Sequence, residues 1–458
     1  MARTKASERL LASLSDTAAF TLETLEAQGI EHAEVSVGVG NELEVGVRQD
    51  EVELVKEAQS SGLSVRVMRN DRVATSSTTD LSRDALTAFV ARAVEMAEIS
   101  EPDPLAVPPE RSELTRRWPD LDLFDPRTDR IDAERGIKMA RTAERAALRS
   151  SKKITASEGA SFSRSSGHSV LATSGGFLGL SAGTYQSLVV QAVADDTGGK
   201  KRAGFYWTGG RFFGELERPS AVGKEAAARA IATLGATKME TGVMPVVFDH
   251  EAARAIVGLV AGCVLGDALY RQRSYLAERM GTAIASKHVT LIDDPLIARG
   301  PGSRAYDGEG RKVAKRVVCA RGELKSFLLD TYSARRLGLA PTGSSGGGGG
   351  IPHSSTSNFY LKAGRRAPES LLKGIRHGLY VTRMMGFGFD PTTGTFSRGA
   401  EGFVIENGEK TVPVSEITIS RNLDDLLLGI DAVANDLEFK TSIASPSFRV
   451  DSMTVAGN

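Results

Sequence analysis

Residues 33–67 read AEVSVGVGNELEVGVRQDEVELVKEAQSSGLSVRV, and this stretch decides how the first half of the chain folds. Valine and leucine alternate with small or polar residues through most of it, which is the pattern of strands with one buried face. Turn-forming residues interrupt the alternation at Gly40-Asn41, Gln49-Asp50 and 60–62, and again at Asn70-Asp71. We therefore expect consecutive short strands joined by tight turns in an antiparallel meander.

Helical periodicity flanks this meander and returns later in the chain. Apolar residues spaced three and four apart predict helices in the first half at 7–27, 86–97, 132–149 and 220–234, with strand-like alternation over 154–213. In the second half, residues 251–265 are apolar on nearly every side and predict a buried helix. Mostly strands follow, with a short helix expected at 422–433.

Strands and helices mix in both halves without the strict alternation of a parallel sheet, which favours the α+β class. At roughly 150 residues per domain, the chain is also too long for one core. We expect an N-terminal domain of a sheet plus helices over 1–238 and a β-rich domain over 239–458. Gly258, Gly262 and Gly266 recur every four residues and predict a smooth ridge that another backbone can approach closely.

Composition narrows the classes of function. Lys and Arg number 57, as do Asp and Glu, so the formal net charge is zero. Binding a phosphate backbone needs a concentrated positive field, so we expect no nucleic-acid partner. No apolar run reaches the roughly 18 residues of a membrane span and no signal peptide is evident, so we expect no membrane association. The two cysteines suit a reducing, cytoplasmic location.

His250-Glu251 is the first candidate for catalytic chemistry. A zinc peptidase helix of this kind needs a second histidine four or five residues after the first. Those positions are occupied by Arg254 and Ala255, and the fixed charge of Arg254 opposes a dication. We interpret the pair as a helix N-terminus with an acidic first turn.

Ser345 is the second candidate, because it lies in a formal G-x-S-x-G match with His353 nearby in the sequence. A nucleophile elbow needs a strand immediately before the serine and a helix immediately after it. Here the glycine run 346–350 follows, which predicts a flexible loop instead.

The remaining candidates are isolated. Asp293-Asp294 precedes a proline, which is typical of a turn that ends a strand. Cys263 and Cys319 have no zinc-binding spacing. The residues by themselves therefore give no complete catalytic or metal-binding set.

Blocks spread over the second half resemble the TldD/TldE (PmbA) metallopeptidase family. They include YRQRSYL at 270–276, YDGEG at 306–310, TYSARRLG at 331–338 and GTFSRGAEGF at 394–403. Further blocks lie at 289–295, 405–409, 413–419 and 422–423, with looser ones at 43–48 and 62–67. Their shared order over most of the chain is far more specific than any single motif, and the forms at 270–271 and 396–399 resemble the TldE (PmbA) branch.

The resemblance implies that this chain has neither a catalytic residue nor a metal ligand. In the TldD branch, an HExxxH helix and a cysteine near the C-terminus hold zinc. When the helices are matched through the block at 270–271, the first histidine falls on Gly258, the glutamate on Leu259 and the second histidine on Cys263. Residues 440–449 contain no cysteine. Those three residues are therefore interpreted as degenerate metal-site positions.

The same resemblance implies a barrel-like C-terminal domain and a heterodimer. A TldD-like catalytic subunit would supply the zinc, and this chain, without a cofactor of its own, would be the non-catalytic subunit that helps to enclose unfolded peptides. The candidate peptide-binding or interface residues are Tyr270, Arg271, Ser397, Arg398 and Asn422.

Extended peptides commonly add to a strand edge, and we expect such an edge in the second half, with the 346–350 loop at the entrance. Two alternatives remain open. One is a self-sufficient hydrolase built on Ser345 with His353, or on His250 with Glu251. The other is a homodimeric peptide-binding protein.

Overall fold

The computed structural model describes residues 5–347, 350–351 and 353–457. The elements of the first half are α1 (Lys5–Ala27), β1 (His32–Arg48), β2 (Glu51–Arg69), β3 (Arg72–Thr78), α2 (Arg83–Ile99), α3 (Ala133–Ser150), β4 (Ile154–Thr173), β5 (Leu178–Asp195), β6 (Lys201–Gly210) and α4 (Pro219–Ala232). All four predicted helices of this half are present. Within the described ranges, no helix is long and apolar enough to cross a membrane.

The second half is richer in strands. Its elements are β7 (Gly242–Phe248), α5 (His250–Cys263), α6 (Gly266–Tyr270), β8 (Leu291–Asp293), β9 (Arg316–Ala320), β10 (Glu323–Leu324), α7 (Thr331–Leu337), β11 (Ser345–Gly346), β12 (His353–Ser354), β13 (Phe359–Leu361), β14 (His377–Met385), β15 (Thr395–Glu406), β16 (Glu409–Asn422), α8 (Leu423–Leu428), β17 (Ile430–Val433), β18 (Ile443–Ala444) and β19 (Phe448–Ala456).

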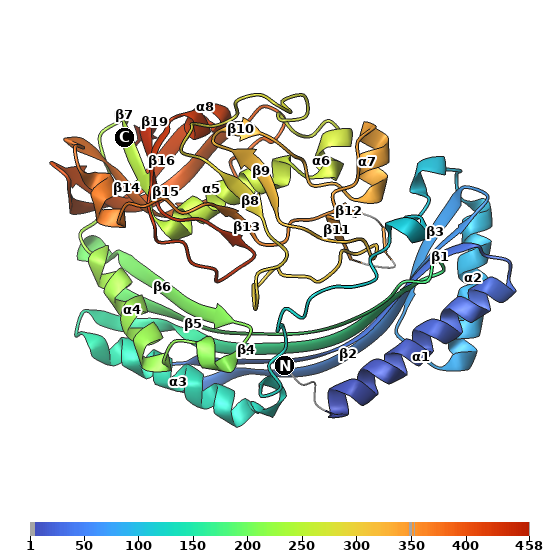
Figure 1. Ribbon diagram of the computed structural model, residues 1–458. Helices are drawn as coiled ribbons and strands as arrows, with labels where there is room; N and C mark the ends of the chain where they lie inside the picture. The colour runs from blue at the N-terminus through green and yellow to red at the C-terminus, as the bar shows by residue number, and fades with distance from the viewer. Residues whose placement is uncertain (1–4, 348–349, 352, 458) are drawn as a thin grey trace.

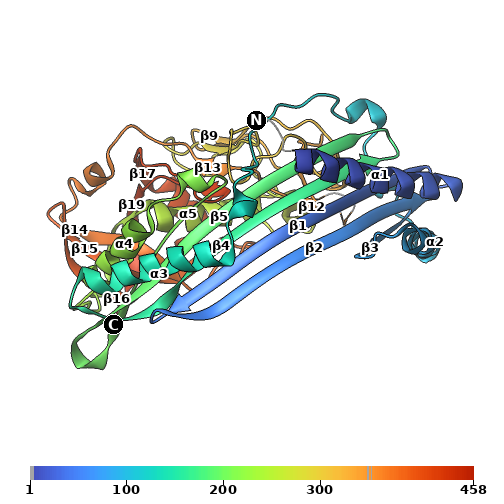
Figure 2. The same cartoon turned by 90° about the horizontal axis from the view of Figure 1, so that it is seen from below.

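A curved antiparallel sheet of order β3-β2-β1-β4-β5-β6 dominates the first half. Helices α1 to α4 cover its convex side, and its concave side faces the second half (Figures 1 and 2). Strand alternation explains this arrangement, because residues such as Val35, Val45 and Phe162 pack against the helices. Their strand neighbours, such as Ser36 and Ser163, then point to the concave side.

The strands of the meander are longer than the sequence predicts. Gln49-Asp50 and Asn70-Asp71 do form turns, with both residues of each pair at positive φ, as tight hairpins require. The turns predicted at Gly40-Asn41 and 60–62 are wrong. β1 and β2 run straight through these positions and pair with each other, with Asn41 opposite Gln59. Pairing with β2 and β4 holds Gly40 extended, and pairing with Gly38 of β1 holds Gly62, so glycine alone does not make a turn.

The second half contains a barrel, which confirms the predicted α+β class with a β-rich, barrel-like second part. β16, β15, β14, β7 and β19 are successive neighbours, and pairing of β16 with β19 closes the ring. A five-stranded sheet of order β10-β9-β8-β13-β18 is the other main layer. One side of α5 packs into the core that these two layers share.

The helix predicted at 422–433 is only partly correct. α8 ends at Leu428, and the chain then enters β17, which pairs with β19 from Ile430 to Val433. Gly429 separates the two elements, and the apolar residues beyond it pair with a neighbouring strand instead of continuing the helix. Periodicity over so short a segment does not distinguish these outcomes.

The halves meet through several polar contacts. The Arg211 guanidinium donates to the carbonyls of Gly300 and Pro301 at 2.9 and 2.7 Å. The Tyr185 hydroxyl donates to the Lys440 carbonyl at 2.6 Å. The domain boundary between residues 238 and 239 stays a prediction.

Candidate functional site

α5 presents the predicted degenerate metal positions on a half-open surface. The Asp249 side chain caps the helix by accepting the Ala252 N–H at 2.7 Å, and residues such as Ile256 and Val260 are buried on its inner face. The prediction that this helix is buried on nearly all sides is wrong. Gly258 and Leu259 are only partly covered, and Gly262 is exposed.

This outer face of α5 borders a groove of about 550 Å³, called the α5 groove below. It is lined by Gly258, Leu259, Gly262, Cys263, Leu265, Asp267, Ala268, Arg271, Arg273, Phe389 and Pro391. A Cβ built on Gly262 would meet no atom within 4 Å, and one on Gly258 would meet only Ile443, at 3.9 Å. The predicted glycine ridge is therefore only partly correct: no described backbone packs against Gly258 or Gly262, but Gly266 begins α6 and is enclosed by the Ser333 side chain.

The α5 groove lacks the donors that a zinc ion needs. Gly258 and Leu259 carry no ligand atom, and Cys263 is buried. Burial raises the pKa of the Cys263 thiol to about 12, so the thiolate that binds metal is scarce at neutral pH. Among the described residues, no group of three or more His, Cys, Asp or Glu side chains is placed to hold a metal ion. The residues present do not fit zinc.

The structure brings Arg271 into the α5 groove together with the three degenerate positions. Its Nε donates to the Tyr270 hydroxyl at 3.0 Å, and Tyr270 makes an edge-to-face contact with Tyr332, with centroids 5.7 Å apart. Arg271 is exposed. The pair 270–271 thus forms a cationic, aromatic rim beside the groove.

Ser397, Arg398 and Asn422 lie outside the lining of the groove. The Ser397 N–H donates to the Gly388 carbonyl at 2.9 Å, which holds the loop that carries Phe389. Burial lowers the pKa of Arg398, whose Nε has no partner among the described atoms. The Asn422 side chain caps α8 by accepting the Asp424 N–H at 3.0 Å, and its Nδ2 donates to the Thr393 carbonyl at 2.8 Å.

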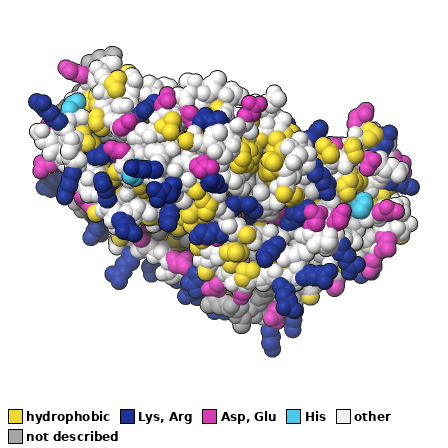
Figure 3. Space-filling view, turned by 45° about the horizontal axis from the view of Figure 1, so that its top comes forward, with side chains coloured by type: hydrophobic (Ala, Val, Ile, Leu, Met, Phe, Trp, Pro, Cys, Tyr) yellow, Lys and Arg dark blue, Asp and Glu magenta, His cyan; other side chains and the backbone are white. Residues whose placement is uncertain are grey.

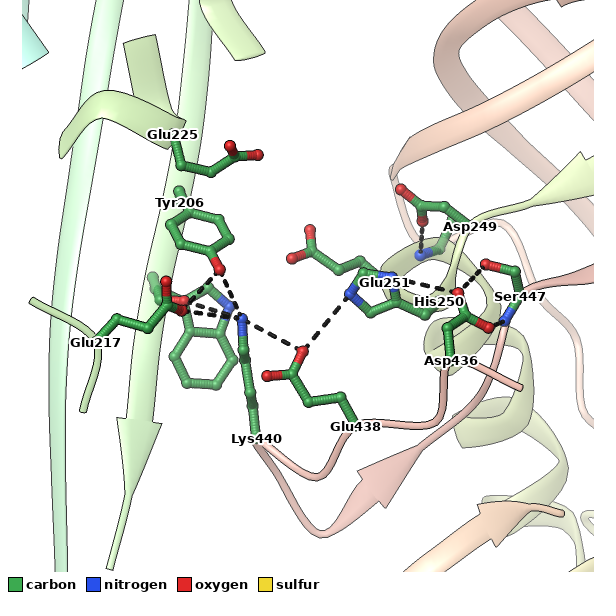
Figure 4. Close-up of polar contacts among 12 residues, drawn as sticks. Tyr206, Glu217, Glu225, Asp249, His250, Glu251, Asp436, Glu438, Lys440 and Ser447 are labelled. Atoms are coloured by element: carbon green, nitrogen blue, oxygen red, sulfur yellow. Dashed lines mark hydrogen bonds and ion pairs between the residues drawn. The ribbon is translucent and has the colours of Figure 1, made fainter. Parts of the chain in front are cut away.

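His250-Glu251 lies at the junction of the two halves, where Figure 4 shows its surroundings. Burial alone would raise the pKa of Glu251, but the ion pair with Arg229 at 2.8 Å outweighs it and lowers that pKa. The His250 ring nitrogens lie 3.9 Å from Asp436 and 3.9 Å from Glu438. These contacts agree with the predicted capped helix N-terminus with an acidic first turn.

The G-x-S-x-G segment does not form a nucleophile elbow. Ser345 lies in the two-residue strand β11, opposite Ser354, while His353 lies opposite Gly346. The Ser345 Oγ is buried and has no partner among the described atoms, and the exposed His353 contacts the Ile351 carbonyl instead. Gly348 and Gly349 of the predicted flexible loop lie outside the described residues.

The side chains of the other isolated candidates are buried or make structural contacts. Asp293 ends β8 and accepts the Ser357 N–H and hydroxyl at 2.7 and 2.8 Å, and Asp294 pairs with Lys315 at 3.2 Å. This confirms the predicted strand-ending turn. Burial raises the pKa of the Cys319 thiol to about 11, which leaves it protonated at neutral pH.

A buried charge cluster between the halves was missed at the sequence level. Arg66 and Glu34, on neighbouring strands β2 and β1, form an ion pair at 2.6 Å, and each side chain is 3% exposed. Burial raises the pKa of Glu309 to about 8, as do the charges of Asp307 and Glu34, while Arg66 opposes the rise. The signal in the sequence that could have revealed this cluster is the pair of oppositely charged residues, Glu34 and Arg66, within two strands of alternating polarity.

Family models match most of the chain. They are described as the PmbA/TldA metallopeptidase domain 1, central domain and C-terminal domain, and they match residues 33–97, 126–234 and 241–457. The metalloprotease PmbA of Escherichia coli O157:H7 is 35% identical over 425 residues, covering 93% of this chain and 92% of the relative. The chain belongs to the PmbA/TldD metallopeptidase family.

Other relatives place the chain in the PmbA (TldE) branch of that family. A PmbA homolog of Haemophilus influenzae is 32% identical, covering 97% of this chain and 96% of its own. A Bacteroides thetaiotaomicron structure named as a modulator of DNA gyrase has a TM-score of 0.90 at 26% identity, covering 97% of this chain and 99% of that one. TldE from Thermococcus kodakarensis shares the fold, with a TM-score of 0.82 at 20% identity over 97% and 99% of the chains.

One relative is named as a modulator of DNA gyrase, but the face of this chain in Figure 3 shows no continuous basic surface of the kind that binds DNA. Lys and Arg side chains are interspersed there with Asp and Glu. The formal net charge of the chain is zero. Absence of nucleic-acid binding remains a prediction.

Proposed function

We propose that this chain is the non-catalytic subunit of a cytoplasmic zinc metallopeptidase that processes unfolded peptides. A TldD-like partner supplies the zinc and the reacting groups. This chain completes the enclosure around the peptide and contributes no metal ligand. The observation that carries the proposal is that Gly258, Leu259 and Cys263, where the family's zinc ligands are expected, give the α5 groove no set of donors able to hold zinc among the described residues.

Coordination chemistry supports this assignment. A catalytic zinc ion takes three protein ligands and keeps one open position for water. Gly258 and Leu259 offer no ligand, and Cys263 offers a protonated thiol inside the core. Because no replacement group of three donors exists among the described residues, a local rearrangement of one side chain would not restore a site.

The open α5 groove is also suited to contact with a second chain. Gly258 and Gly262 present bare helix backbone, and the exposed Arg271 lies at the rim. A partner's backbone or a peptide can therefore come closer to α5 than side chains would otherwise permit. We place the TldD-like subunit or its peptide at this groove, with Tyr270 and Arg271 in contact.

The test compares the chain alone with the reconstituted complex. We expect less than 0.1 zinc per chain by mass spectrometry of the purified protein, and no peptide cleavage. Mixing it with the TldD-like subunit of the same organism should give cleavage that a chelator abolishes. One tightly bound zinc per chain, or chelator-sensitive cleavage by the chain alone, would refute the proposal.

Two variants separate this proposal from the self-sufficient hydrolase. Ser345→Ala and Glu251→Ala should leave the complex fully able to cleave, because neither side chain reacts. Loss of a cleavage that the unaltered chain shows by itself would instead identify a catalytic site here. The native mass of the mixture distinguishes the heterodimer from a homodimeric peptide-binding protein.

A further inference from the structure

The outer edge of β5 is only partly covered by its neighbour. β6 pairs with β5 from Gln186 onward, although β5 begins at Leu178. The Leu123 carbonyl accepts the Thr184 N–H at 3.0 Å, and from there back to Leu178 none of the described strands pairs with this edge.

The uncovered edge offers unused backbone groups. In an extended strand, the N–H and C=O of alternate residues face the same edge, so those of Leu180 and Ala182 face outward with those of Thr184. Within the described chain these groups have no hydrogen-bond partner. Such an edge is a template for another extended segment.

A cavity of about 420 Å³ lies against this uncovered edge and wraps around it. Glu8 of α1 and Phe124, whose ring lies 4.9 Å from that of His168, line it on the helix side of the sheet. Arg304 and Tyr306 line it on the concave side. The strand edge itself, at residues 180–182, forms the wall between them. The volume is that of a small ligand site.

Two residues that line the cavity each keep one buried polar atom unpaired. Asp122 pairs with Arg299 through Oδ2 at 2.7 Å, but its Oδ1 has no partner among the described atoms. Arg304 donates through its two terminal nitrogens to residues 345 and 355, but its Nε has no partner. A peptide group supplies both a donor and an acceptor, and would match this pair.

The remaining lining favours a side chain with an apolar stem and a positive end. Glu8 brings a carboxylate, and Asp122 adds a second, although its Oδ2 is already paired with Arg299. Trp118 and Tyr306 add aromatic faces, with ring centroids 5.1 Å apart. Lysine and arginine have this chemistry, because their stems pack on apolar surface and their charges are attracted to aromatic faces.

We propose that an extended peptide adds to the outer edge of β5 at Leu180 and Ala182 and places a lysine or arginine side chain in the adjacent cavity. This inference rests on the proposed function, since the peptide bound here is the one that the complex processes. It places the peptide-capturing edge in the first half of the chain, whereas the sequence led us to expect it in the second half.

The binding test uses the full chain and a defined peptide. Trp207→Phe leaves Trp118, which lines the cavity, as the only tryptophan and fluorescence reporter. The probe is a blocked heptapeptide, Ala-Thr-Val-Lys-Val-Thr-Ala, acetylated and amidated at its ends. One comparison peptide has Glu in place of Lys, and a second is methylated on the backbone nitrogens that flank the Lys.

We expect the Lys peptide to bind at least ten-fold more tightly than either comparison peptide. Backbone methylation removes the donors needed for strand addition, and Glu brings a like charge to the carboxylates. Equal binding of the methylated peptide would overturn strand addition. Equal binding of the Glu peptide would overturn the assignment of a basic side chain.

A variant of the edge gives a second readout. Ala182→Pro removes an outward N–H but no bond to β4, so the sheet should fold, and binding should weaken at least ten-fold. Ala182→Ser keeps the N–H and serves as the matched control, with unchanged affinity. Unchanged binding by a folded Ala182→Pro variant would refute the proposal. A chain that supports cleavage with its partner but fails these binding tests would refute the edge site and leave the proposed function standing.

Discussion

The α5 groove and the junction between the two halves differ in exposure and in the side chains that line them. The groove is open and borders bare glycine, and the three positions where ligands are expected carry no usable donor. The junction is closed and holds Glu34, Arg66 and Glu309 with hardly any exposed area. The junction thus depends on buried charges, whereas the groove leaves helix backbone accessible. This difference predicts that substitutions will affect stability at the junction and assembly at the groove.

Breaking the buried ion pair should have the largest effect on stability. Arg66→Met leaves the Glu34 carboxylate buried without its partner, which costs about 3–5 kcal/mol. Urea unfolding at pH 7, followed by circular dichroism, measures the change. The control combines Arg66→Met with Glu34→Leu, which removes both charges and should recover most of the loss. If the single variant lost under 1 kcal/mol, the junction would not depend on this pair.

Glu309 should make the stability of the unaltered chain depend on pH. Its folded pKa of about 8 lies above the roughly 4.3 of an unfolded glutamate, so between these values the folded state holds a proton that the unfolded state has lost. Raising the pH from 5 to 8 therefore lowers the free energy of unfolding, by at most about 1.4 kcal/mol per pH unit.

Glu309→Gln should flatten that slope, because the amide does not titrate. Thermal unfolding midpoints of both proteins across pH 5 to 8 give the comparison. Some slope should remain in the variant, since burial also raises the pKa of Asp249 to about 7. Parallel curves for the two proteins would show that Glu309 is ionised in the folded chain and would contradict the expected proton uptake.

Local patterns made much of the fold predictable, and long-range contacts decided the rest. The turn at Asn70-Asp71 was visible because asparagine and aspartate tolerate positive φ by themselves. Gly40 looked the same locally, but pairing with β2 and β4 on both sides kept it extended. Likewise, β19 converted the end of the predicted 422–433 helix into β17.

The candidate site shows the same division. Spacing located α5 and its glycine ridge, but not that Gly262 lies open while Gly266 is enclosed. The junction cluster joins Glu34 and Arg66 to Glu309, far away in sequence. A single sequence carries no record of which distant residues meet. The same limit hid the β5 edge, which is uncovered because β6 ends early.

Gly262 on α5 and Gly266 at the start of α6 allow a matched test of openness. In Gly266→Ala, the new methyl group would collide with the Ser333 side chain and approach the Ser354 hydroxyl, which should cost about 1–3 kcal/mol. Chemical unfolding would detect a change of that size, and an unaffected variant would mean that the two serines move aside freely.

Gly262→Ala is the matched change on the open side and should have the smallest effect on stability. Its methyl group meets no atom within 4 Å, and alanine favours a helix over glycine by up to about 1 kcal/mol. The variant should therefore be as stable as the unaltered chain or slightly more so. Since the fold is indifferent to this methyl group, weaker assembly with the proposed TldD-like subunit, measured by titration, would report a contact made at the bare helix. A destabilised variant would instead show that the groove closes in solution.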